Sequence, residues 1–231
     1  MTTVAIMQPA YLPWLGYFAL MDRVDVFVFL DSVQFGRRSW QPRNRIKGAN
    51  GPQMLTVPVY KKGLRDQKIA DVRINHDFGF PEKHVRAIEA GYAKAPFYDR
   101  YAPDLFDRLR RPREFLAELT IDLIDWITEV LGIETRRLRS GSLQTAGGKA
   151  DLLADICRRL GATLYVSPVG SKEYLSASES FDRIGVPIVY NEYAHPTYPQ
   201  IHSVFEPYLS VIDLLFNVGP ESLAVIRQGV R

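Results

Sequence analysis

The first thirty residues limit the fold most, because they place a strand, a turn, a helix and a second strand in that order. Residues 4–7 form a short apolar run, and Pro9 and Pro13 delay regular structure until a helix over residues 14–21. Residues 24–30 form a second apolar run. This succession is typical of two parallel strands in an α/β sheet.

The rest of the chain interrupts this alternation and then restores it. Glycine-rich turns predict a β-hairpin insertion over about residues 33–75, and apolar periodicity predicts a helical region over about residues 80–131. Further strands are expected at residues 54–59, 69–74, 164–166 and 186–190, helices at 81–92, 112–131, 149–160, 209–216 and 220–226, and a partly helical stretch at 174–184. We therefore expect a single α/β domain over residues 1–231, with a Rossmann-like mixed or parallel sheet at its core.

Composition narrows the class of protein. With 46% hydrophobic and 24% charged residues among 231, the chain can bury a substantial core. A net charge of +3 gives little reason to expect a nucleic-acid partner. No apolar stretch approaches the roughly 20 residues of a membrane-spanning helix, and no signal pattern opens the chain, so we expect a cytoplasmic protein without membrane insertion. The single cysteine, Cys157, excludes a disulfide framework, and no metal-ligand spacing occurs.

The turn after the first strand is the first candidate site. It contains Gln8, Tyr11, Trp14 and Tyr17. Open α/β sheets bind ligands at the carboxyl ends of their strands, and aromatic rings with polar tips suit a sugar, a nucleoside base or a pantetheine arm. Alternatively, the aromatic side chains only fasten the first helix onto the sheet.

Two residues are candidate catalytic groups. Asp31 ends the second strand, so Gln8 and Asp31 are expected to face a common crevice, where the carboxylate would act as a general base or hold an amine. His195, in a Pro-broken polar stretch with Tyr198 and Gln200, suits acid–base chemistry near neutral pH. The alternatives are an ordinary turn at Asp31 and a plain surface histidine at position 195.

Two further stretches carry groups that suit anions. The first contains Arg38, Trp40, Asn44, Arg45 and Lys47, whose guanidinium groups beside an aromatic ring suit phosphate or carboxylate, or an acidic carrier protein. A solvated, charged hairpin is the alternative.

The second stretch follows the strand at 164–166 and contains Gly170, Ser171, Lys172 and Tyr174. Its backbone N–H groups could face an anion, with Lys172 as the counter-charge. It lacks the glycine spacing of a Walker A loop, so it is not a nucleotide-phosphate loop of that type.

Several blocks resemble the WbqC-like protein family nearly from end to end. They include Met7, Gln8 and Pro9 with Tyr11, Pro13, Gly16, Tyr17 and Phe18, residues 27–35, residues 38–40 with 44–47, residues 56–59, 92–97, 160–165, 170–174 and 209–217. Gln34 lies in the second block and is a further substrate-binding candidate. The resemblance implies a product of bacterial O-antigen, capsule or secondary-metabolite gene clusters, often beside acyl-carrier or aminotransferase genes.

These features together predict an enzyme that moves an acyl or aminoacyl group from a thioester donor to an amino sugar, a sugar nucleotide or a related amine. The donor would carry phosphopantetheine, either free or on an acyl or peptidyl carrier protein. Asp31 or His195 would deprotonate the amine, and the Gly170–Lys172 turn would hold phosphate or the developing oxyanion. No other cofactor and no metal is expected.

Two alternatives stay open. One is a nucleotidylyltransferase-like enzyme, although Pro13-Trp14-Leu15-Gly16-Tyr17 stands where such enzymes have His-x-Gly-His. The other is a noncatalytic protein that binds a sugar nucleotide for a partner enzyme.

Overall fold

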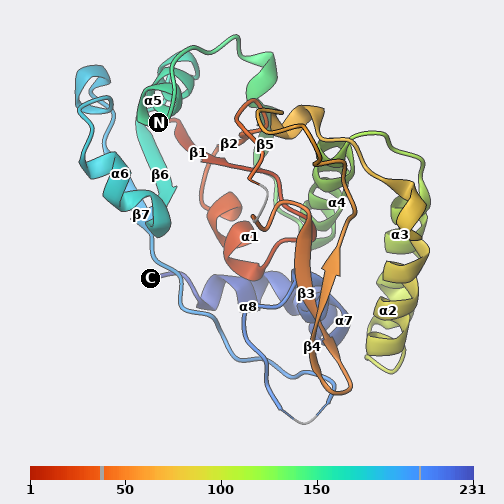
Figure 1. The fold of residues 1–231 in the computed structure, drawn as a ribbon. Helices are drawn as coiled ribbons and strands as arrows, with labels where there is room; N and C mark the ends of the chain where they lie inside the picture. The colour runs from red at the N-terminus through yellow and green to blue at the C-terminus, as the bar shows by residue number, and fades with distance from the viewer. Residues whose placement is uncertain (37–38, 203) are drawn as a thin grey trace.

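The computed structural model describes residues 1–36, 39–202 and 204–231 and contains a five-stranded sheet (Figure 1). Its strands are β1 (Thr3–Met7), β2 (Val26–Phe29), β5 (Arg136–Arg139), β6 (Leu164–Pro168) and β7 (Ile188–Asn191). They lie in the order β5-β2-β1-β6-β7, and each neighbouring pair is parallel. The expected α/β fold with a Rossmann-like parallel sheet is confirmed.

Alternate residues of β1 face two different cores. Ala5 packs into a core that includes α1 (Leu15–Asp22) and α4 (Leu116–Leu131), whereas Val4 and Ile6 pack into a second core formed largely by α5 (Ala150–Arg159). Such alternation follows from the period of two along a strand. The central strands of the sheet are therefore buried on both faces, as a parallel sheet requires.

The insertion between β2 and β5 carries a separate antiparallel hairpin, as expected. Its strands are β3 (Arg43–Gly48) and β4 (Gly51–Thr56). Short 3-10 turns, η1 (Ile69–Asp71) and η2 (His76–Phe78), follow it, and then come the helices α2 (Glu82–Tyr92) and α3 (Tyr98–Arg110) before α4. Residues 69–74, expected as a strand, instead form η1 and two isolated bridges, Ile74 with Val59 and Arg73 with Phe115.

The hairpin lies against α2 at one close contact. A Cβ atom on Gly91 would lie 2.6 Å from the carbonyl oxygen of Lys47, so only glycine allows the backbones to approach this closely. The hydroxyl of Tyr92, the next residue, accepts from the N–H of Lys47 at 2.8 Å. The hairpin is thus fixed relative to the helical region.

The C-terminal part of the chain passes the hairpin, and its helices lie in the lower part of the view in Figure 1. After η3 (Ser140–Ser142), η4 (Val169–Ser171), α6 (Lys172–Ser176) and η5 (Asp182–Ile184), the chain passes β7 and reaches α7 (Val211–Val218), η6 (Gly219–Glu221) and α8 (Ser222–Gln228). The N–H of Ser210 donates to the carbonyl of Arg45 at 2.8 Å, which brings this segment beside β3. None of the helices in the described ranges is both long enough and apolar enough to cross a bilayer.

Candidate functional site

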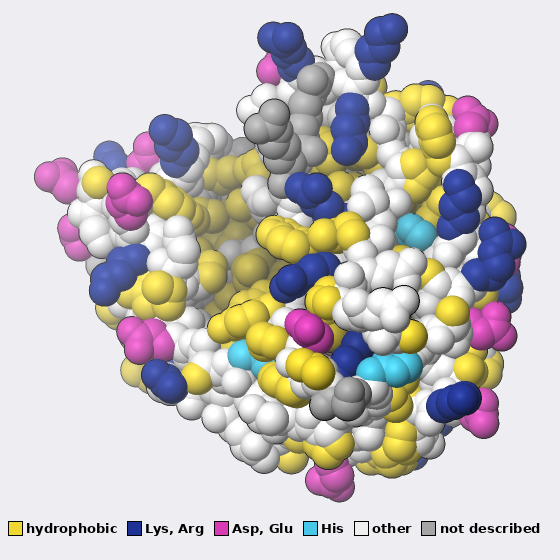
Figure 2. All heavy atoms as spheres, turned by 60° about the horizontal axis from the view of Figure 1, so that its bottom comes forward, with side chains coloured by type: hydrophobic (Ala, Val, Ile, Leu, Met, Phe, Trp, Pro, Cys, Tyr) yellow, Lys and Arg dark blue, Asp and Glu magenta, His cyan; other side chains and the backbone are white. Residues whose placement is uncertain are grey.

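A cavity of about 610 Å³ opens beside β1, where the order of the strands in the sheet reverses. The chain passes from β1 to β2 on one side, whereas β6 lies on the other side of β1. Crevices at such a switch point are the usual ligand sites of open α/β sheets. Figure 2 shows the hollow, lined mainly by hydrophobic side chains.

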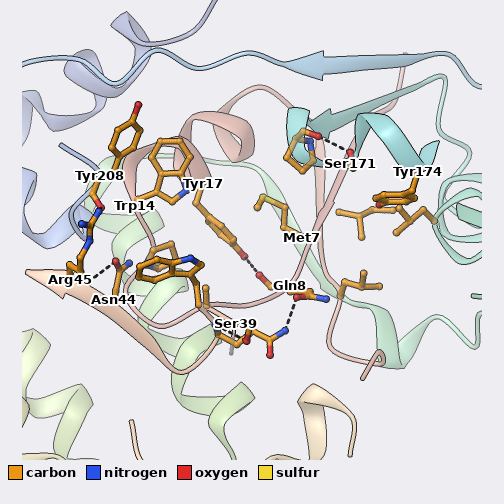
Figure 3. A pocket seen from close by; sticks show the side chains of 18 of the residues that line it. Met7, Gln8, Trp14, Tyr17, Ser39, Asn44, Arg45, Ser171, Tyr174 and Tyr208 are labelled. Carbon is orange, nitrogen blue, oxygen red and sulfur yellow. Dashed lines mark hydrogen bonds between the residues drawn. The ribbon is translucent and has the colours of Figure 1, made fainter. Parts of the chain in front are cut away.

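Six aromatic side chains and six polar side chains line this cavity. The aromatic ones are Trp14, Tyr17, Trp40, Tyr165, Tyr174 and Tyr208, and the polar ones are Gln8, Ser39, Gln41, Asn44, Arg45 and Ser171. Trp14, Arg45 and Tyr208 lie at one end, and Ser171 and Tyr174 lie at the other (Figure 3). The arrangement suits a ligand with a ring or apolar body and a few polar groups.

The turn after β1 supplies the central wall. Trp14 lies against Gly16, since a Cβ atom at residue 16 would overlap the indole ring. The hydroxyl of Tyr17 donates to the carbonyl of Gln8 at 3.4 Å (Figure 3). Burial and the nearby carboxylate of Asp125 raise the pKa of Tyr17 well above its usual value, so this phenol stays protonated.

One amide pair joins that turn to the hairpin. The Nε2 of Gln41 donates to Oε1 of Gln8 at 2.6 Å, and Oε1 of Gln41 accepts from the N–H of Gly36 at 3.2 Å. Asn44 adds a second link, because its Nδ2 donates to the carbonyl of Leu12 at 2.6 Å. The insertion therefore closes one side of the cavity.

Arg45 brings the positive charge of the site. Its guanidinium lies 6.0 Å from the ring centre of Trp40, and its Nη2 donates to the carbonyl of Tyr208 over 3.4 Å. Its Nε is buried and has no hydrogen-bond partner. Among the described residues that line the cavity, Arg45 is the only one with a formal charge at neutral pH.

Only part of the turn after β6 lines the cavity, whereas the sequence predicted that all four of its candidates would bind the ligand. Ser171 and Tyr174 line the cavity, but Gly170 and Lys172 do not. The hydroxyl of Ser171 donates to the carbonyl of Pro168 at 2.7 Å, and the ammonium of Lys172 lies 5.6 Å from the ring centre of Tyr190. Lys172 is therefore turned towards β7 and does not supply a counter-charge in the cavity.

Asp31 lies outside the cavity, contrary to the expectation of a crevice shared with Gln8. Its carboxylate is 1% exposed. It accepts from Nε of Arg139 at 2.5 Å, from the hydroxyl of Ser140 at 3.0 Å and from the N–H of Gly141 at 3.2 Å. The reason is that β5 pairs with the far side of β2, so Asp31 fastens the ends of β2 and β5 together.

Tyr11 faces the interior and not the cavity. Its hydroxyl donates to Nδ1 of His84 at 2.8 Å, and Nε2 of His84 donates to the carbonyl of Thr56 at 3.2 Å. Burial lowers the pKa of His84 to about 4, so the imidazole is neutral and can accept from Tyr11. Tyr11 therefore joins the turn after β1 to α2 and does not line the cavity.

Lys47, Tyr198 and Gln200 form a buried polar network around Asp213. The hydroxyl of Tyr198 donates to Oδ2 of Asp213 at 2.9 Å, and the ammonium of Lys47 also donates to the carbonyls of His202 and Val204. Burial raises the pKa of the Asp213 carboxyl, although these hydrogen bonds oppose the shift. The bonds from Lys47 thus hold Gln200, His202 and Val204 on the hairpin.

His195 lies directly behind the cavity wall. Its ring stacks on Trp14, with centres 6.5 Å apart, and meets Tyr208 edge-on at 5.0 Å. Nδ1 donates to the carbonyl of Pro196 at 2.8 Å, which leaves Nε2 as the basic nitrogen, buried and without a partner. Burial lowers the pKa of His195 below its usual 6.5, so the base is unprotonated at neutral pH.

Two other candidates lie elsewhere. Gln34 is exposed and donates to the carbonyl of Arg65 at 2.9 Å, away from the cavity. Arg38 lies outside the described residues. No group of three His, Cys, Asp or Glu side chains suited to a metal ion occurs in residues 1–36, 39–202 and 204–231.

The sequence did not single out Gln41, Ser39, Tyr165 or Tyr208 as lining residues. Gln41 and Ser39 stand beside Trp40 in the basic stretch, so they could have been found as its neighbours. Tyr208 gave no local signal, because it reaches the cavity only through the return of the chain across the hairpin.

Comparison with known proteins assigns the family. The sequence model of the WbqC-like protein family matches residues 8–225. The chain is 37% identical to the uncharacterized protein Rv1507c of Mycobacterium tuberculosis over 229 residues, which cover 98% of either chain. No solved structure matches the chain. The family match spans the turn after β1, the hairpin and the segment of Tyr208, and the chain belongs to the WbqC-like protein family.

Proposed function

We propose that this protein is an enzyme of bacterial surface-polysaccharide or natural-product biosynthesis that transfers an acyl or aminoacyl group. The donor is a phosphopantetheine thioester, free or on a carrier protein, and the acceptor is the amine of an amino sugar or a related compound. The observation that carries this proposal is the aromatic cavity at the switch point, with Arg45 as its only charged lining residue among those described. Aromatic faces suit sugar rings and the pantetheine arm, and a guanidinium suits phosphate.

In the proposed reaction, the acceptor nitrogen attacks the thioester carbonyl carbon and forms a C–N bond. The C–S bond then breaks, and the thiol leaves with the proton that the nitrogen loses. No Asp, Glu, His, Cys or Lys side chain lines the cavity among the described residues, so most of the rate enhancement comes from holding the two reactants together.

His195 is the proposed proton acceptor. Its Nε2 is basic, unpaired and one ring away from the cavity, behind Trp14 and Tyr208. Tyr208 is 51% exposed, and an outward turn of its ring gives up its contacts with Trp14 and His195. In this proposal Tyr208 turns to let Nε2 reach the amine. Asp31 has no part in the step, because Arg139, Ser140 and Gly141 occupy its carboxylate.

A noncatalytic sugar-nucleotide-binding protein is the second candidate. The lack of a lining acid or base among the described residues favours it. A nucleotidylyltransferase has less support, since histidine is also missing from the described lining residues.

The test is an assay of the purified protein with thioester donors and nucleotide-linked amino sugars, followed by mass spectrometry. Acyl transfer predicts an amide product and release of the free thiol in equal amounts. Binding of the acceptor without product from any donor would favour the noncatalytic candidate. Neither binding nor product across the panel would reject both candidates.

A further inference from the structure

Arg45 stands in an unusual electrostatic position. Among the described lining residues of the cavity it has no acidic neighbour, and its guanidinium is held beside the Trp40 ring. The apolar walls lower the local dielectric, which strengthens the field of a single charge. The Arg45 end of the cavity therefore attracts an anion.

The guanidinium of Arg45 also has an N–H donor without an acceptor. Its Nε is buried without a partner, and the bond from Nη2 to the carbonyl of Tyr208 is long at 3.4 Å. A buried donor without an acceptor is unfavourable, so an oxyanion that reaches this guanidinium gains more than it would at a guanidinium already paired with protein. Arg45 thus differs from Arg139, which Asp31 pairs.

Other cationic side chains near the cavity already contact protein groups. Lys172 lies over Tyr190, and Lys47 is 2% exposed and donates to Gln200 and to two carbonyls. The α6 helix spans only Lys172–Ser176, so its N-terminus adds little field. Arg43 also lies beside Trp40, 5.8 Å from the ring centre, but it does not line the cavity and its Nε donates to the carbonyl of Ser39 at 3.0 Å. Among the described lining residues, the anion position therefore belongs to Arg45.

We infer that Arg45 binds the phosphate of a phosphate-ester ligand, whose organic part extends along the aromatic wall towards Ser171 and Tyr174. The inference rests on the proposed function, because the thioester donor and the nucleotide-linked acceptor both carry phosphate. The ends of the cavity in Figure 3 set the direction: phosphate beside Arg45 and Tyr208, organic body across Trp14 and Tyr17.

The experiment compares two pairs of probes by calorimetry: uridine diphosphate with uridine, and 4′-phosphopantetheine with pantetheine. Wild type is measured beside Arg45→Gln, Arg45→Lys and the control Arg136→Gln, which removes an exposed charge from the edge strand β5. Circular dichroism and thermal unfolding verify that each variant is folded. The pair that shows a phosphate preference identifies the source of the ligand.

Wild type should bind the phosphate-bearing member of one pair at least about tenfold more tightly, a difference of about 1.4 kcal/mol. Arg45→Gln should abolish the preference without weakening the neutral member, Arg45→Lys should keep part of it, and Arg136→Gln should keep all of it. The inference would be overturned if folded Arg45→Gln kept the phosphate preference. It would also be overturned if wild type bound neither phosphate-bearing probe, or bound each no more tightly than its neutral partner.

The outcomes also separate this inference from the proposed function. Loss of the phosphate preference in Arg45→Gln, with no amide product from wild type, leaves the anion site standing and rejects acyl transfer. Amide product from wild type, with an unchanged preference in Arg45→Gln, rejects the anion site and leaves acyl transfer standing.

Discussion

The side chains of Lys47 and Asp213 are joined through the amide of Gln200. The ammonium of Lys47 donates to Oε1 of Gln200 at 2.9 Å, and Nε2 of Gln200 donates to Oδ2 of Asp213 at 2.7 Å. Both charged side chains are almost fully buried. This connection fastens the segment that carries Tyr208 to the hairpin that carries Arg45, so it fixes one end of the cavity.

Lys47→Met should therefore destabilise the protein by about 3 to 5 kcal/mol, because it leaves the Asp213 carboxylate buried without its counter-charge. Chemical denaturation measures the loss. Lys62→Met, at an exposed position, is the control and should change little. The double variant Lys47→Met with Asp213→Asn should lose less than the sum of the single variants, and strict additivity would show that the two charges are not coupled.

The buried imidazole of His84 should make stability depend on pH. Its pKa is lowered to about 4 in the folded protein, so the unfolded chain binds the proton first as the pH falls. Stability from this group is complete above about pH 6.5 and declines by about 3 kcal/mol as the pH falls from there to 4.

His84→Gln, which can still donate to Thr56 and accept from Tyr11, should remove that decline. Unfolding free energies of wild type and variant at a series of pH values give the comparison. Parallel pH curves for the two proteins would contradict the assignment.

Gly16 should control the position of Trp14. A methyl group at residue 16 overlaps the indole ring, so Gly16→Ala must displace Trp14 from the cavity wall, at a cost of about 1 to 3 kcal/mol in stability. Ligand affinity should fall as well. Gly170→Ala is the matched control, because a Cβ atom there meets nothing within 4 Å. Equal ligand binding by the two variants would show that Trp14 does not contact the ligand.

His195 should determine the acidic limb of the pH–rate profile. Burial lowers its pKa, so the rate should fall only when the pH drops below the usual 6.5 of histidine. His195→Gln should lower turnover about a hundredfold and abolish this limb while the acceptor still binds. A variant with full turnover and an unchanged profile would leave positioning as the sole source of catalysis.

The sequence predicted the central strands well because they are short apolar runs. It did not predict β5, since three of the four residues in Arg136–Arg139 are arginines, as suits a charged sheet edge. The helix α3 was predicted only as part of the helical region over residues 80–131 and not as a separate helix, because Pro103 lies within it.

The candidate site was predictable only where its residues follow a strand directly. Gln8, Trp14 and Tyr17 come after β1, and Ser171 and Tyr174 come after β6, so topology alone brings them together. Asp31 follows the same rule, but Arg139 of the neighbouring strand draws its carboxylate away. Lys47, Tyr198 and Gln200 have the polar character of site residues, yet they gather around Asp213, a partner that no local pattern indicates.

The most direct test of the central claim, that the aromatic cavity is the working site, is kcat/KM for amide formation by Trp40→Ala. Trp40 is 54% exposed and lines the cavity, so its removal leaves the core intact, and Phe78→Ala removes a ring that is 62% exposed and does not line the cavity. Trp40→Ala should lower kcat/KM about tenfold, or roughly 1.4 kcal/mol of binding to the transition state, with Phe78→Ala near wild type. Equal kcat/KM in the two variants would contradict the claim.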